Sequence, residues 1–268
     1  MAELYRNEVY NFQEGGFGLG TETLAPNSDD TIQCFFETKA ELETLLTALK
    51  QTLPQNSKYD QSEIVDTDWK EKWKEYSHPV EISPRLIVHS SWHSIEDKAN
   101  QQSIVVDPEM AFGTGSHPTT KMCLKLIDSL YEDIKSSPKS VLDVGCGSGI
   151  LSVAADLFGA TEVLGVDINE EAILVSAANA SKNKAWNCQF GQTDLAEVSG
   201  KFDLVIANIL SGTLKTLWPE IVSHTKEGGS IILSGLLEEE KDSFFDSIGA
   251  DVQTLLCDEN WIAAHLHR

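Results

Sequence analysis

Basic residues are scarce in this sequence: 20 lysines and arginines stand against 42 aspartates and glutamates, which gives a formal net charge of −22. The acidic excess is spread along the chain and is not gathered in a tail. Such a charge repels phosphate backbones, so it argues against direct nucleic-acid binding and favours a neutral ligand or a basic protein as partner. Solubility alone would explain the same charge.

Membrane and targeting segments are also lacking. No apolar run approaches the roughly 20 residues needed to cross a bilayer, so no membrane partner is predicted. The start, MAELYRNEVYNF, lacks the basic and apolar stretches of a signal peptide. We therefore expect a soluble cytoplasmic protein, and 268 residues suffice for a large and a small domain.

Metal and disulfide patterns are absent as well. The five cysteines form no C-x-x-C pair and their number is odd, which indicates reduced thiols. His265 and His267 alternate along the last strand-like run, so they share one face, but no third ligand stands near them. No metal site is predicted.

What the sequence does contain from Ser140 onward is a regular alternation of short β-branched runs and helical segments, which is typical of parallel βαβ units. No helix-length segment separates the last two runs, DVQTLL and WIAAHL, so we expect a final antiparallel hairpin. The pattern predicts an α/β fold with a doubly wound sheet, whose ligands bind beyond the carboxyl ends of the strands. The expected parallel strands are 140–144, 162–166, 188–190, 202–207 and 230–234.

The residues before this region predict a second, smaller unit. A strand over 31–36 and a helix with leucines at helical spacing precede the polar stretch QNSKYDQSE and the segment DWKEKWKEY. We predict a small domain over 1–60, a linker with a helix over 61–84, and a catalytic domain over 85–268.

A glycine-rich turn follows the first strand of the alternating region, in VLDVGCGSGIL. Gly145, Gly147 and Gly149 let the backbone turn sharply and approach a nucleotide closely. Ile150 stands where a dinucleotide fingerprint has its third glycine, and no G-K-[ST] is present. This disfavours nicotinamide-dependent oxidoreductases and excludes a P-loop.

Two polar residues end neighbouring strands of the same region. Asp167, in GVDIN, is placed to accept hydrogen bonds from ribose hydroxyls, although it could also cap the next helix, where Asn169 is better placed. Asp143 suits the turn and the amino group of a methionine moiety. Asn208, in FDLVIANIL, is placed to accept hydrogen bonds from a target nitrogen, or else to cap the following helix. Together with the glycines, these residues are typical of enzymes that use S-adenosylmethionine.

Upstream, AFGTGSHPTT supplies flexible glycines, one aromatic ring and several hydroxyls, as expected of a loop that covers a ligand. With this loop, the glycine turn, GVDIN and ANIL, the sequence resembles the PrmA family of bacterial methyltransferases, which modify ribosomal protein L11 of the large subunit. The resemblance runs from about Asp68 to the end of the chain. Glu109 departs from the family's usual glycine, and only MAELYR precedes the segment that resembles the family's substrate domain.

The resemblance implies a seven-stranded class I methyltransferase fold, Rossmann-like with an antiparallel final strand, and a small ferredoxin-like amino-terminal domain, here shortened. It implies methyl transfer from S-adenosylmethionine to lysine and α-amino groups of L11. His117 is a candidate general base because histidine titrates near neutral pH, or it positions the loop. The cofactor contacts implied by the resemblance are Phe112, Gly113, Thr120, Gly145, Asp167 and Asn208, and the glycine turn adds Gly147.

Two other functions fit the same residues. One is a related methyltransferase that acts on a different protein or on a small amine. The other is a non-catalytic module that binds S-adenosylmethionine, although such a scaffold has no need of Gly145, Asp167, Asn208 and the loop together.

Overall fold

The computed structural model describes residues 78–96, 98–107, 115–132 and 137–268. All of them belong to one compact unit of the chain, Val65–Arg268. The small domain, the linker helix and the strand and helix predicted before residue 78 lie outside the described residues, so the domain boundaries stay predictions.

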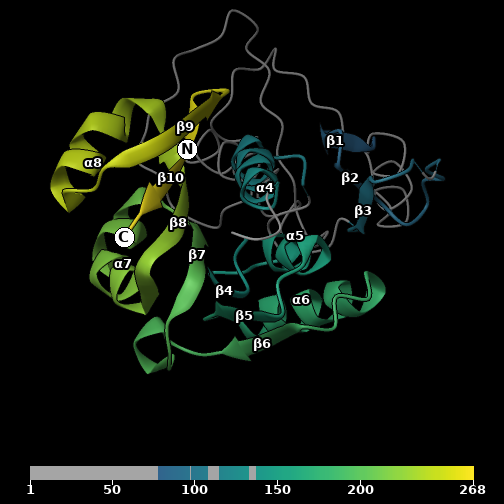
Figure 1. Cartoon of the computed structure of the whole chain (residues 1–268), viewed down its shortest axis with the longest axis horizontal. Coiled ribbons are helices and arrows are strands. Elements are labelled where there is room, and N and C mark those ends of the chain that lie inside the picture. Colours follow the sequence, from purple (N-terminus) through teal and green to yellow (C-terminus); the bar gives the residue numbers. More distant parts are fainter. Residues whose placement is uncertain (1–77, 97, 108–114, 133–136) are drawn as a thin grey trace, which may run out of the picture. The chain divides into compact units, whose positions relative to one another are not determined.

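The main sheet has seven strands in the order β6-β5-β4-β7-β8-β10-β9 (Figure 1). All neighbours are parallel except β10, which runs antiparallel to both β8 and β9. The predicted antiparallel hairpin is therefore confirmed, and its second strand lies between the first strand and β8. The strands are β4 (Ser140–Val144), β5 (Glu162–Asp167), β6 (Cys188–Gln192), β7 (Phe202–Asn208), β8 (Thr225–Leu237), β9 (Val252–Asp258) and β10 (Trp261–His267).

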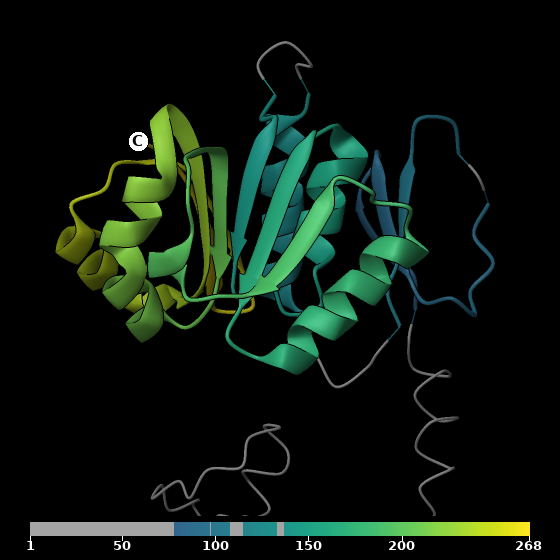
Figure 2. The same ribbon diagram turned by 90° about the horizontal axis from the view of Figure 1, so that it is seen from below.

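Helices cover both faces of this sheet, as the prediction of a doubly wound fold requires (Figures 1 and 2). Alternate residues of β7 serve the two faces: Leu204 and Ile206 belong to the core under α4 and α5, and Val205 and Ala207 to the core under α7 and α8. All four are fully buried, which explains why β7 reads as a continuous apolar run. The helices are α4 (Pro118–Leu130), α5 (Ile150–Phe158), α6 (Glu170–Lys182), α7 (Ser211–His224) and α8 (Lys241–Ile248).

A second, three-stranded sheet precedes α4. In it, β1 (Val80–Ser83) pairs antiparallel with β2 (Leu86–His89), and β2 pairs parallel with β3 (Gln102–Val105). The run RLIVH (85–89), at the start of the predicted catalytic domain, contains β2. β1 falls within the stretch assigned to the linker, and β3 was not predicted. Buried residues of this sheet join the same core as α4 and α5: Ile82, Leu86, Val88 and Ile104.

Arg85, between β1 and β2, ties this small sheet to the end of α4. One guanidinium nitrogen lies 2.6 Å from Oδ1 of Asp128, and another donates to the carbonyl oxygen of Tyr131 at 3.1 Å. The guanidinium also lies 5.3 Å from the ring centre of Phe158. An arginine that is paired, bonded and stacked holds its position well. None of the helices in the described ranges is long and apolar enough to cross a membrane.

Candidate functional site

The glycine turn after β4 has the sharp bend that its sequence predicts. Gly145, Gly147 and Gly149 have φ values of +70°, +53° and +76°, in the left-handed region that side chains disfavour. The N–H of Gly145 donates to the carbonyl of Val166 on β5 at 2.8 Å. A Cβ at Gly145 would lie 2.6 Å from Cγ2 of Ile209, which follows β7. The turn therefore touches the ends of both neighbouring strands.

Asp167 ends β5 beside this turn and is half-buried. Its Oδ2 accepts the N–H of Gly147 at 3.0 Å, and its Oδ1 accepts the N–H of Asn169 at 3.0 Å. Asn169 itself caps α6 by accepting the N–H of Glu171 at 2.9 Å, as the sequence predicted. A carboxylate has about four acceptor positions, so Asp167 can still accept bonds from a ligand.

Asn208 ends β7 at the same edge of the sheet and is half-buried. The N-cap of α7 is Leu210, and among the described residues no side-chain cap bond is formed there, so the alternative that Asn208 caps α7 is wrong. Across the described part of the chain, the amide of Asn208 has no hydrogen-bond partner. It is therefore available to a ligand or substrate.

Gly235 allows β8 to pass close to the residue after Asn208. Its φ is +89°, and a Cβ there would lie 2.2 Å from the carbonyl oxygen of Ile209. The N–H of Ile209 donates to the carbonyl of Ser234 at 3.1 Å. Sequence reasoning missed this glycine because it lies inside an apolar strand. The available signal was the glycine itself, since a glycine inside a strand often marks the close approach of another backbone.

His117 is the N-cap of α4. Its Nδ1 accepts the N–H of Thr119 at 3.3 Å and lies 2.7 Å from the hydroxyl of the same residue. The ring packs edge-on against Trp261 with centres 5.3 Å apart. Burial lowers the pKa of His117, and nearby Glu259 only partly opposes this. The ring is therefore neutral at pH 7, and one of its nitrogens is engaged in capping.

Thr120, in the first turn of α4, has a buried hydroxyl with no partner in the parts of the chain that are described. The residue is 1% exposed. Such an unpaired polar group is costly, and it usually indicates a ligand or an ordered water. This observation agrees with the cofactor contact predicted at Thr120.

Asp143 lies beneath the glycine turn, 1% exposed. Its Oδ2 accepts bonds from the backbone and hydroxyl of Ser152 on α5, at 3.2 and 2.7 Å. Burial raises the pKa of Asp143 to about 6, although the bonds from Ser152 oppose the rise. One of its oxygens therefore fixes α5 beneath the turn.

Phe112 and Gly113, the other predicted cofactor contacts, lie outside the described residues, as does Glu109. The described residues resume at Gly115, which has a φ of +85°. A Cβ at Gly115 would lie 2.7 Å from Cγ1 of Val88 and 3.2 Å from Cδ1 of Ile150. Gly115 is thus packed closely between β2 and the start of α5.

The family model for ribosomal protein L11 methyltransferase (PrmA) matches residues 5–268 of this chain. The chain belongs to this family. A ribosomal protein L11 methyltransferase of Haemophilus influenzae (strain PittEE) is 39% identical over 232 residues, which are 85% of this chain and 77% of that protein. One from Actinobacillus succinogenes is 38% identical over 248 residues, or 91% and 83%.

A solved structure agrees with this assignment. The crystal structure of ribosomal protein L11 methylase from Lactobacillus delbrueckii subsp. bulgaricus matches with a TM-score of 0.64 and 32% identity, over 71% of this chain and 98% of that one. The predicted class I methyltransferase fold and the resemblance to PrmA are confirmed. The protein is an S-adenosylmethionine-dependent methyltransferase, and the glycine turn, the available acceptors of Asp167 and the unpaired Thr120 hydroxyl fit that cofactor.

Two further residues at this edge were missed by the sequence analysis. Ile168, directly after Asp167, is 82% exposed, and Leu210, close after Asn208, is 70% exposed. Large apolar side chains exposed beside a ligand site are candidates for contact with it. Their positions, one residue after Asp167 and two residues after Asn208, were the available signal. The described residues hold no group of three or more side chains suited to a metal ion.

Proposed function

We propose that this PrmA-family protein methylates lysine side chains, and also the α-amino group, of ribosomal protein L11. Its relatives carry the name of that substrate. The observation that supports an amine as acceptor is Asn208, whose amide lies without a partner from the described residues at the edge that carries the glycine turn. An amide oxygen there can accept a hydrogen bond from an amine and orient its lone pair.

The cofactor contacts are proposed for residues around the same edge. The backbone of Gly145 and Gly147 gives close access, Asp167 accepts bonds from the ribose hydroxyls, and the hydroxyl of Thr120 donates to the methionine carboxylate. Phe112 and Gly113 are proposed to add contacts from the preceding loop.

When bound, S-adenosylmethionine supplies a methyl group on a positively charged sulfur. The lone pair of the neutral amine forms the new N–C bond, while the electrons of the broken C–S bond stay on sulfur. At pH 7 a lysine with a pKa near 10.4 must first lose a proton, which costs about 4.6 kcal/mol. Removal of water from the amine lowers its pKa, and water takes the proton. Alignment by Asn208 then lowers the barrier further.

His117 was a candidate base, but we propose that it positions the start of α4. Its Nδ1 already accepts a backbone N–H, and burial keeps its ring neutral. The bonded nitrogen is not available for a proton, and the lowered pKa makes the imidazole a weaker base toward a lysine. The role proposed for His117 is to hold the helix turn that carries Thr120.

The net charge of −22 also suits a basic ribosomal protein, because opposite charges steer association. No direct contact with nucleic acid is proposed. The reaction is placed in the cytoplasm, where ribosomal proteins are made.

The experiment is transfer of label from S-adenosylmethionine to unmethylated L11, followed by acid hydrolysis and amino-acid analysis. We expect labelled methyl-lysine, and no transfer by the Asp167→Ala variant. Label on the amino-terminal residue would report the α-amino group, and label on a side chain other than lysine would refute the lysine assignment. Cofactor binding by calorimetry without any label on L11 would point to a different protein or small-amine substrate.

A further inference from the structure

Helix α6 contacts the cofactor edge along its first three turns. Its N-cap, Asn169, lies two residues after Asp167. Farther along, Gly149 lies so close that a Cβ on it would be 2.7 Å from Cβ of Ser176. Asn179, which is 3% exposed, donates from Nδ2 to the carbonyl of Ser148 in the glycine turn at 2.9 Å. The helix is therefore packed against the glycine turn and bonded to it.

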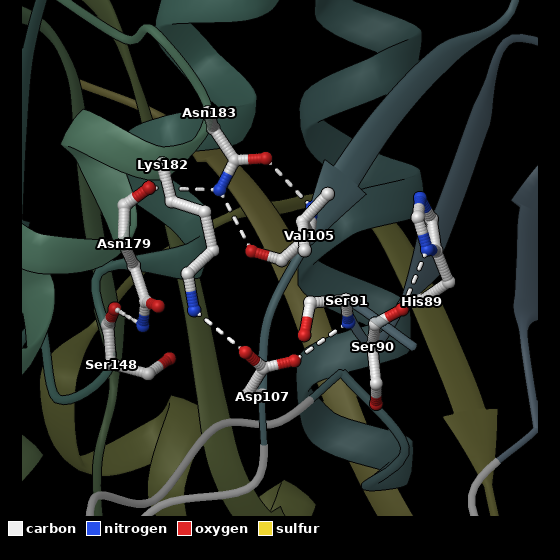
Figure 3. Close-up of polar contacts among 9 residues, drawn as sticks. All are labelled: His89, Ser90, Ser91, Val105, Asp107, Ser148, Asn179, Lys182 and Asn183. Carbon is white, nitrogen blue, oxygen red and sulfur yellow. Dashed lines mark hydrogen bonds and ion pairs between the residues drawn. The ribbon is translucent and has the colours of Figure 1, made fainter. Parts of the chain in front are cut away.

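The C-terminal end of the same helix is hydrogen-bonded to the small sheet. Asn183 accepts the N–H of Val105 at 2.7 Å through Oδ1 and donates to the carbonyl of Val105 at 2.8 Å through Nδ2 (Figure 3). Val105 belongs to β3, an edge strand, so the amide supplies the two bonds that a further strand would make. Asn183 also donates to the carbonyl of Asn179 at 2.8 Å, which links it to the residue that holds the turn.

A third contact holds Asp107, which lies two residues after the end of β3. Lys182 lies 2.8 Å from Oδ2 of Asp107, and Oδ1 of Asp107 accepts the N–H of Ser91 at 2.6 Å (Figure 3). Burial alone would raise the pKa of Asp107, but the bonds from Lys182 and Ser91 outweigh it and lower that pKa. The carboxylate is thus ionised at neutral pH. The side chains of Lys182 and Asp107 are 32% and 21% exposed.

These contacts form one continuous connection from the glycine turn to Asp107, and nothing in the proposed chemistry uses them. We propose that Asn179, Lys182 and Asn183 are positioning residues: they fix β3 and Asp107 relative to the glycine turn and so preorganise the cofactor site. A site held in its binding geometry loses less conformational freedom when the ligand binds. Their contribution is therefore to cofactor affinity and not to the methyl-transfer step.

The test compares cofactor binding and turnover in variants of this connection. Asn183→Leu keeps the size of the side chain and leaves Val105 without its two bonds. We expect it to raise the Kd for S-adenosylhomocysteine and the KM for S-adenosylmethionine about tenfold, because unpaired polar groups loosen β3. The kcat at saturating cofactor should stay within about twofold of the wild type, because Asn208 is untouched.

The ion pair gives a second, independent arm. Asp107→Asn and Lys182→Met should each raise the Kd about two- to fivefold, the range for a partly exposed pair. The double variant should be no worse than either single one, because both remove the same interaction. Lys182→Arg keeps the charge and should restore binding. Lys98→Gln is the matched control, since Lys98 pairs with Glu81 at 3.9 Å in the same region but does not touch α6.

The proposal rests on the proposed function only through the cofactor. Calorimetry with S-adenosylhomocysteine needs no protein substrate, so an error in the L11 assignment would leave this readout intact. A lower unfolding temperature with unchanged Kd and KM in Asn183→Leu would mean a structural role alone and would overturn the proposal. If that variant does not fold, an unchanged Kd in both Asp107→Asn and Lys182→Met would overturn it equally.

Discussion

Replacing Thr120 by valine should make the cofactor-free protein more stable and its cofactor binding weaker. Valine has nearly the shape of threonine, so the substitution removes the hydroxyl and leaves the packing around α4 intact. The hydroxyl is buried and has no partner from the described residues. Leaving such a group unpaired costs about 1–3 kcal/mol, so its removal should raise the free energy of unfolding by that amount.

The substitution should weaken cofactor binding by a free energy of similar size. If the hydroxyl donates to the cofactor, the variant loses that bond, and a loss of about 1–3 kcal/mol lowers affinity by roughly 5- to 150-fold. Thermal unfolding without cofactor should shift upward by about 2–4 °C for each kcal/mol gained. Calorimetry with S-adenosylhomocysteine should show the weaker binding.

Thr119→Val is the matched control at the neighbouring position. Thr119 is 2% exposed, and its hydroxyl lies 2.7 Å from Nδ1 of His117, so this variant loses a formed bond. It should lower the unfolding temperature, opposite to Thr120→Val. The reasoning is refuted if Thr120→Val destabilises the free protein, or if it binds the cofactor as tightly as the wild type.

Further predictions concern Gly235 and Asp143. Gly235→Ala should lower both stability and kcat, because its Cβ would meet the carbonyl of Ile209 beside Asn208; chemical unfolding should show a loss of about 3 kcal/mol or more. Gly200→Ala, where φ is +97° but the space is open, should cost only about 1–2 kcal/mol and leave kcat unchanged; equal losses at both glycines would contradict this. For Asp143, the folded pKa of about 6 lies above the usual 3.8, so its ionisation destabilises the folded state as the pH rises from 4 to 6. Unfolding in denaturant at several pH values should therefore show Asp143→Asn gaining up to about 3 kcal/mol over the wild type at pH 8 and little at pH 4. A gain that does not depend on pH would refute that pKa.

The carboxyl edge of the main sheet could be predicted because its signals are local. A strand that ends in Asp167, a turn that needs positive φ at Gly145 and a strand that ends in Asn208 are each specified by a few adjacent residues. Parallel strands bring such ends together without further information. The final antiparallel hairpin followed from the spacing of the last two apolar runs.

The small sheet and its attachment could not be predicted in the same way. Strands as short as β1 and β3 give too few residues for a periodic pattern. The bonds between Asn183 and Val105 join residues far apart in the sequence, and an asparagine at a helix end is explained equally well as a cap. His117 shows the same limit: histidine chemistry indicated a base, and only its contact with the N–H of Thr119 indicates a cap.

The most direct test is the mass of L11 after incubation with S-adenosylmethionine and either wild type or Asn208→Ala. We predict that the wild type adds methyl groups that map to amino groups of L11. Asn208→Ala should bind S-adenosylhomocysteine within a few-fold of the wild type but turn over about 100-fold more slowly, a loss near 2.7 kcal/mol of transition-state stabilisation. Wild-type rates in that variant, or an unchanged mass of L11 with the wild type, would contradict the account.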